Sequence, residues 1–214
     1  MVTELAPPDD HVLLAAWRAG DRDKGNALFE RHIRSVLRFF RTKVPDAAAD
    51  LTQTTFLALS ELAPDRIGNV PFRAYLFGIA RNQLLMHLRS KLRATKRFDP
   101  LTESARDAGA GPARLVARQQ QHVVLAQALQ QLPVDYQVAL ELHYFEGLAL
   151  AEIAEVLERP VGTIKSLLSR GRDLLRDHLE KLSSSEELLS SIVGELERWM
   201  ATLPELVRGQ DAEA

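Results

Sequence analysis

Apolar side chains recur at steps of three and four residues along most of the chain, which is the spacing of one face of an α-helix. In the first half, this spacing predicts helices over about 24–40, 46–62 and 71–97. In the second half, it predicts four shorter helices over about 115–131, 133–144, 150–157 and 161–178. Runs of β-branched residues are short, so the chain is predicted to be all-α.

Two breaks in this pattern divide the chain. Residues 99–113 contain two prolines and two glycines without an apolar period, which indicates a flexible linker. Two small helical domains are therefore predicted, over 10–98 and 114–182. The tail, 183–214, opens with three serines and then regains a helical period, so it is predicted to form an amphipathic helix. Its apolar stripe would fold back onto a binding surface, extend the core of the second domain, or mediate dimerisation.

Two short helical patterns between Tyr144 and Leu175 are separated by the break at 158–160, which has the sequence Glu-Arg-Pro. A four-residue turn between two compact helices is the arrangement of a helix-turn-helix, whose second helix enters the major groove of DNA. With Ile164 and Leu168 assigned to the buried face, six residues are predicted to point outward: Thr163, Lys165, Ser166, Leu167, Ser169 and Arg170. An ordinary helical hairpin is the alternative at this point.

Charge is distributed unevenly along the chain, although its overall net charge is only −2. Residues 11–98 carry 16 Lys and Arg against 7 Asp and Glu, a net charge of +9. Residues 119–182 have a net charge of −3, and the tail has a net charge of −5. A basic half favours a polyanionic partner such as nucleic acid, and an acidic tail can compete for the same surface. An ordinary solvated surface is the alternative.

Composition excludes several classes of protein. The 214 residues include no Cys, which excludes disulfides, thiolate catalysis and Cys-ligated zinc. The six histidines are scattered without helical metal-binding spacing, and neither a phosphate loop nor a nucleophile elbow occurs. We therefore predict no enzyme activity, no metal and no cofactor. No apolar run reaches the roughly 20 residues of a membrane span and no signal peptide is visible, so we expect a cytoplasmic protein.

Motifs in both halves point to one family. Residues 147–157 (GLALAEIAEVL) and 160–166 (PVGTIKS) lie in the helix-turn-helix pattern, and 128–133 (ALQQLP) precede them. Residues 50–56 (DLTQTTF) and 72–82 (FRAYLFGIARN) lie in the basic half. The first group resembles the promoter-reading domain of extracytoplasmic-function (ECF) RNA polymerase sigma factors, which belong to the sigma-70 family. The second group resembles their polymerase-binding and promoter-melting helices. The resemblance covers about residues 10–182.

The resemblance implies a sigma factor that directs core RNA polymerase to promoters, for a stress or envelope-response regulon, with an anti-sigma factor as a further candidate partner. On the polymerase, the clamp helices of the largest subunit and the flap would be contacted. The residues expected to bind the polymerase are Asp50, Leu51, Gln53, Thr54 and Phe56. Those expected to melt the promoter and bind its single strand are Asp65, Arg66, Gly68, Asn69, Arg73, Tyr75, Arg81 and Asn82. The six outward residues of the second helix would read duplex DNA.

The chain departs from the usual family pattern at four positions. Tyr75 stands where Trp is common, Met86 where Asp is usual, Ala149 where a Ser or Thr helix cap is usual, and Leu167 where Arg is frequent. The missing cap at Ala149 is expected to cost about 1 kcal/mol, and Leu167 is expected to pack on a thymine methyl. The alternative function is a stand-alone helix-turn-helix regulator with a separate sensor domain. That reading leaves the motifs at 50–56 and 72–82 unexplained.

Overall fold

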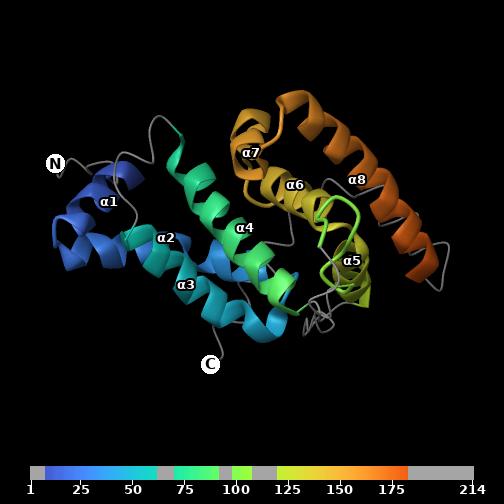
Figure 1. Ribbon diagram of the computed structural model, residues 1–214, viewed down its shortest axis with the longest axis horizontal. Coiled ribbons are helices and arrows are strands. Elements are labelled where there is room, and N and C mark those ends of the chain that lie inside the picture. Colours follow the sequence, from blue (N-terminus) through green and yellow to red (C-terminus); the bar gives the residue numbers. More distant parts are fainter. Residues whose placement is uncertain (1–7, 62–69, 92–97, 108–119, 183–214) are drawn as a thin grey trace, which may run out of the picture.

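The computed structural model describes residues 8–61, 70–91, 98–107 and 120–182, with 120–123 described in their backbone alone. Within these residues the chain forms helices and one isolated bridge, between Ser104 and Pro133, so the predicted all-α fold is confirmed. The N-terminal unit comprises α1 (Asp10–Arg18), α2 (Arg22–Arg41), the 3₁₀ turn η1 (Pro45–Ala47), α3 (Ala48–Glu61) and α4 (Phe72–Lys91). The C-terminal unit comprises α5 (Gln120–Gln131), α6 (Val134–Tyr144), α7 (Leu150–Leu157) and α8 (Val161–Leu182). Figure 1 shows the two units side by side, with α4 packed against α7 at their boundary.

The helix that sequence reasoning missed is α1. It begins after Asp9, whose side chain accepts a hydrogen bond from the backbone N–H of His11 at 2.8 Å. This contact satisfies an amide that the first turn of a helix leaves without a partner. Leu13 and Leu14 are buried against the rest of the N-terminal unit. With nine residues, the helix is too short to show a clear apolar period by itself.

A glycine allows α1 to pack closely on α2. A Cβ placed on Gly25 would lie 2.4 Å from Cδ1 of Trp17, so the indole ring occupies the space that any other side chain would need. Asp21 caps the start of α2 by accepting from the amides of Asp23 and Lys24 at 3.1 and 3.2 Å. The close contact and the cap together fix the angle at which the chain turns from α1 into α2.

The predicted helix-turn-helix is formed by α7, the turn and α8. The side chain of Ala149 makes no cap, as expected, but Glu152 Oε2 accepts from the Ala149 amide at 2.7 Å, so half of the capping interaction remains. After α7, Glu158 adopts a left-handed conformation with φ of 53°, which reverses the chain direction. The Pro160 carbonyl then accepts from the amide of Thr163 at 2.8 Å as α8 begins.

Part of the predicted linker is packed against the C-terminal unit. Phe98 and Ala105 are buried, and the carbonyls of Pro100 and Glu103 accept from the first amides of α6 at 2.9 and 3.1 Å. These carbonyls supply partners that α6 lacks, because no side chain caps its first turn. Residues 98–107 are therefore held by contacts. Residues 108–113 and the tail 183–214, with its predicted amphipathic helix, lie outside the described residues.

Candidate functional surfaces

The exposed face of α3 carries most of the residues predicted to bind polymerase. Asp50, Gln53 and Thr54 are exposed, and the Thr54 hydroxyl donates to the Asp50 carbonyl at 2.8 Å. Two of the five predicted contact residues are buried: Phe56 is 4% exposed, and Leu51 is 9% exposed and holds α3 against the core. The helix brings it inward because a side chain one residue from Asp50 is rotated by about 100°. Leu57, which is 57% exposed, lies on the outer side and was missed.

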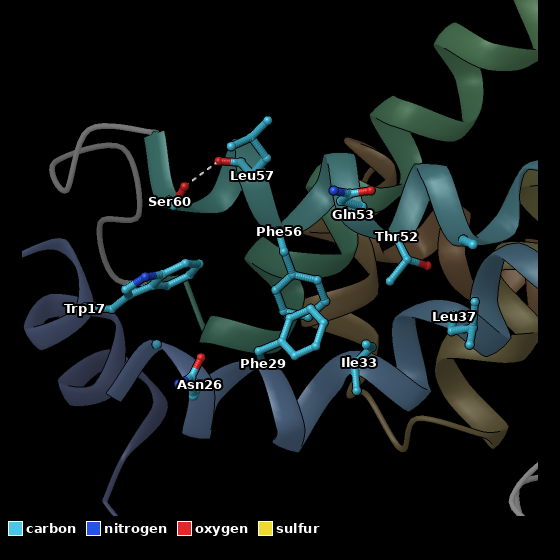
Figure 2. A pocket seen from close by; sticks show the side chains of 12 residues that line it. Trp17, Asn26, Phe29, Ile33, Leu37, Thr52, Gln53, Phe56, Leu57 and Ser60 are labelled. Atoms are coloured by element: carbon cyan, nitrogen blue, oxygen red, sulfur yellow. Dashed lines mark hydrogen bonds between the residues drawn. The ribbon is translucent and has the colours of Figure 1, made fainter. Parts of the chain in front are cut away.

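Beside this face, an apolar groove of about 640 Å³ runs between α2 and α3 (Figure 2). Its lining includes Trp17, Phe29, Ile33, Phe56 and Leu57. The rings of Phe29 and Phe56 lie 4.7 Å apart at their centroids, so the two helices meet through an aromatic contact at the groove floor. The helical spacing along 24–40 assigns Phe29 to the apolar face of that helix. The ring is in fact partly exposed, because α3 leaves the groove open on that side.

The residues predicted to melt promoter DNA lie on α4 and on the segment before it. Asn82 is exposed, Tyr75 is half-buried and Arg73 is partly exposed. Arg81 is buried, with Nη2 and Nε at 2.7 and 3.2 Å from Oδ1 of Asp135 on α6. The four other predicted residues, Asp65, Arg66, Gly68 and Asn69, lie outside the described residues. A basic side chain predicted to bind DNA is thus covered by the C-terminal unit.

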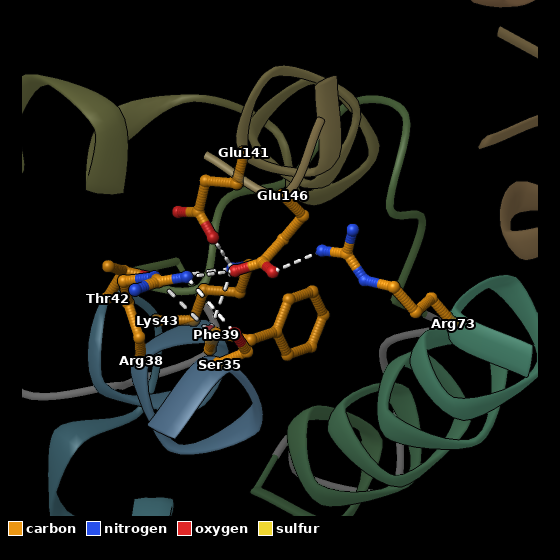
Figure 3. A network of polar contacts seen from close by, with 8 residues as sticks. All are labelled: Ser35, Arg38, Phe39, Thr42, Lys43, Arg73, Glu141 and Glu146. Carbon is orange, nitrogen blue, oxygen red and sulfur yellow. Dashed lines mark hydrogen bonds and ion pairs between the residues drawn. The ribbon is translucent and has the colours of Figure 1, made fainter. Parts of the chain in front are cut away.

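Further ion pairs join the two units (Figure 3). Glu146, just after α6, pairs with Arg38 of α2 and with Arg73 of α4, whose Nη2 lies 2.8 Å from Glu146 Oε2. Lys43 is fully buried, pairs with Glu141 of α6, and lies 3.9 Å from the ring centroid of Phe39. Burial lowers the pKa of the Lys43 ammonium, whereas the Glu141 carboxylate opposes that shift by favouring the charged form.

The predicted DNA-reading helix is α8. Lys165, Ser166, Ser169 and Arg170 are exposed and Thr163 is partly exposed, as a reading face requires. Leu167 is only 4% exposed, so the prediction that it points toward DNA is wrong. It lies three residues after Ile164 and four before Gly171, which places it on the buried face of the helix.

One titratable residue away from these surfaces, His32, has contacts that fit a structural role. His32, which the helical spacing along 24–40 assigns to the apolar face of that helix, is buried on α2, and its Nε2 lies 2.9 Å from Oδ2 of Asp10. Burial lowers the pKa of His32, and Asp10 partly offsets the effect. The described segments contain no group of three or more His, Cys, Asp or Glu side chains arranged to hold a metal ion.

Comparison with known proteins identifies both units. Residues 28–94 match the family model "Sigma-70 region 2", and residues 122–175 match "Sigma-70, region 4". Among curated proteins, the chain is 29% identical to the RNA polymerase sigma-H factor of Pseudomonas aeruginosa over 189 residues, which is 83% of this chain and 97% of that protein. It is 25% identical over 182 residues to the ECF RNA polymerase sigma-E factors of Haemophilus influenzae and Escherichia coli K12. These alignments cover 81% of this chain and 96% and 95% of the two relatives.

The chain belongs to the ECF group of the sigma-70 family. It is therefore an RNA polymerase sigma factor, which binds core polymerase and promoter DNA and initiates transcription. Sigma factors are initiation subunits and not catalysts. The stand-alone regulator is rejected, because region 2 accounts for the basic N-terminal half that it left unexplained.

A solved structure supports the fold of this sigma factor. It is the structure of CnrH in complex with the cytosolic domain of CnrY, which is similar with a TM-score of 0.57 and 24% identity. The match covers 81% of this chain and 99% of that chain. Among the described helices of this sigma factor, none is long and apolar enough to cross a bilayer.

Proposed function

We propose that this sigma factor binds core polymerase through the exposed face of α3 and the groove beside it. Asp50, Gln53 and Thr54 form a polar edge next to exposed Leu57 and the aromatic floor of the groove. An apolar centre with a polar rim is typical of protein interfaces, and a groove between helices suits a helical partner. The clamp helices of the largest polymerase subunit would occupy this surface, while the flap would receive the C-terminal unit.

At the promoter element about ten base pairs upstream of the start site, α4 and the segment before it would hold the displaced DNA strand. Arg73 and Arg81 supply cations, and Tyr75 and Asn82 supply a ring and an amide on the same helix. Single-stranded DNA is bound by positive grooves together with rings on which bases stack. Asp65, Arg66, Gly68 and Asn69 would complete this site.

At the promoter element about thirty-five base pairs upstream of the start site, the start of α8 would enter the major groove of the DNA. The supporting observation is that one side of the helix carries exposed Lys165, Ser166, Ser169 and Arg170 with partly exposed Thr163, while its other side is buried. Lys165 and Arg170 would contact guanine edges or phosphates, and the hydroxyls would contact either. Leu167 has no direct role in this readout.

The test is transcription in vitro from a genomic library with core polymerase and the purified sigma factor. We expect defined start sites that share two upstream elements. The double variant Asp50→Ala/Gln53→Ala should lose core binding and all of these transcripts while keeping its helical content. Asp173→Ala, which also removes one exposed carboxylate from a helix, should transcribe normally. A folded wild-type chain that neither binds core polymerase nor yields start sites would refute the proposal.

We also propose where the factor works and what controls it. It would act in the cytoplasm on the promoters of a stress or envelope-response regulon, and an anti-sigma factor would hold it inactive. The similar CnrH chain is bound to the cytosolic domain of another protein, which supports protein-based control. The mapped start sites would identify the regulon directly, and genes outside stress or envelope functions would contradict that part of the proposal.

A further inference from the structure

The first turn of α8 carries an exposed apolar side chain that is not among the proposed reading residues. Val161 is the first residue of the helix and is 41% exposed, whereas Ile164 on the inner face is 0% exposed. A single exposed valine is ordinary on a protein surface. The position of Val161 on the reading helix, and not its exposure alone, therefore decides what it can do.

Val161 shares one face of α8 with the proposed reading residues. Positions 161, 162, 165, 166, 169 and 170 are all exposed, and each lies three or four residues from another member of the set, which is the spacing of neighbours on one helical face. In a helix-turn-helix, the N-terminal residues of the second helix contact the base edges. The exposed face of α8 thus begins with Val161, at the end of the helix that meets the bases.

The glycine that follows Val161 is not required by the fold. A Cβ placed on Gly162 would meet nothing within 4 Å, and its φ is not positive, so neither packing nor backbone conformation demands a glycine there. Glycine is also less favourable than alanine within a helix. Glycine does allow another molecule to approach the backbone closely. On this face of α8 that molecule would be DNA, which would bring the neighbouring Val161 within reach of a base.

The chemistry of this face suits one base in particular. In the major groove, thymine presents an O4 acceptor and an apolar C5-methyl group. The Ser166 hydroxyl donates its hydrogen to the Gly162 carbonyl at 3.2 Å, and Lys165 offers only charged donors. Leu167, the other apolar candidate for contact with a thymine methyl, is 4% exposed. Val161 is the exposed apolar side chain that can take this contact.

We propose that Val161 is a specificity-determining residue, whose isopropyl group packs on the C5-methyl of a thymine in the promoter element read by α8. This inference rests on the proposed role of α8 in reading duplex DNA. The other three bases have no methyl group at that place, so thymine would be preferred. Burial of one methyl group corresponds to about a fourfold gain in affinity.

The test removes that methyl group from the DNA. The probe is a labelled duplex of one promoter mapped by library transcription, in which each thymine of the upstream element, on either strand, is replaced in turn by deoxyuridine. Deoxyuridine lacks the C5-methyl and keeps the O4 acceptor. Fluorescence anisotropy would give the affinity of holoenzyme assembled from core polymerase and the full chain, as wild type or Val161→Ala. The matched control is Val12→Ala, the same truncation at a side chain of α1 that is 60% exposed.

We expect deoxyuridine at one position to weaken binding by the wild-type and Val12→Ala holoenzymes about fourfold. Val161→Ala should bind the unmodified promoter less tightly by a similar factor, and should not distinguish deoxyuridine from thymine at that position. Gly162→Ala should weaken promoter binding without lowering the melting temperature, because its Cβ meets nothing in the protein and would meet DNA. The wild-type measurement with deoxyuridine needs no change in the protein.

The inference would be overturned if the upstream element held no thymine, or if wild type bound every deoxyuridine promoter as tightly as the unmodified one. It would also fail if Val161→Ala kept the wild-type sensitivity to deoxyuridine, or if Gly162→Ala bound as tightly as wild type. The proposed function would survive these results provided that Lys165→Ala and Arg170→Ala still weakened promoter binding. It would fail separately if the wild-type holoenzyme yielded no start sites.

Discussion

The burial of Leu167 leads to a prediction that separates a structural from a DNA-reading role. If Leu167 lay in the major groove, loss of its side chain would alter the choice of promoter and leave the fold intact. In the structure, Leu167 is 4% exposed on the inner face of α8. Truncating a buried Leu to Ala removes apolar contacts and leaves a cavity, at a cost of about 2–5 kcal/mol.

The expected change in melting temperature follows from the size of the chain. For proteins of about 150–250 residues, 1 kcal/mol of destabilisation lowers the melting temperature by roughly 2–4 °C. Leu167→Ala should therefore melt about 5–15 °C below wild type, measured by far-UV circular dichroism. The matched control is Leu57→Ala, the same truncation at a side chain that is 57% exposed. It should change stability by no more than about 0.5 kcal/mol.

Transcription in vitro completes the test at a temperature where both variants are folded. Leu167→Ala should use the wild-type set of promoters, whereas Leu57→Ala should bind core polymerase less tightly. If Leu167→Ala melted with wild type and changed the preferred upstream element, the residue would face DNA. The packing of α8 described above would then be wrong.

Three further predictions concern other parts of the chain. Gly25→Ala should lower the melting temperature, because its Cβ would lie 2.4 Å from the Trp17 ring, and Trp17 emission should shift. Burial lowers the pKa of His32 in the folded chain, so the unfolded chain binds the proton more readily and stability should fall as pH drops below about 6.5. His32→Gln should make the free energy of unfolding depend less on pH between about pH 8 and pH 5. Lys165→Ala and Arg170→Ala should each cost about 1–3 kcal/mol in promoter binding by the holoenzyme if they contact base edges, and should weaken all promoters alike if they contact phosphates.

Each of these has a control on the same chain. Gly78→Ala on α4 adds a Cβ that meets nothing within 4 Å, so it should raise stability by about 0.5–1 kcal/mol. His11→Gln, at an exposed position, should keep the wild-type dependence of stability on pH. Arg172→Ala removes an exposed cation of α8 beyond the reading set. If it reduced promoter binding as much as the Lys165→Ala and Arg170→Ala variants do, the assignment of the reading face would be refuted.

Much of the fold could be predicted because helices are specified locally. An apolar side chain at every third or fourth position forms a stripe only in a helix, and the positions of α2, α3, α6, α7 and α8 followed from that period. The turn before α8 was also visible, because Glu-Arg-Pro interrupts the period. The short α1 was missed because its stability comes from a cap and from packing of Leu13 and Leu14 against other helices.

The sequence by itself determined the helices, the charge of each half and the motifs from which the family could be predicted. Only the tertiary structure decided which side chains on those helices are accessible. Leu167 lies near the edge of the buried face of α8, and the packing of neighbouring helices decides that its side chain is buried. Arg81 and Asp135 are 54 positions apart, and Arg38 and Glu146 are 108 apart. No local period relates such residues, because an ion pair at that separation depends on how two helical units pack and exclude water between them.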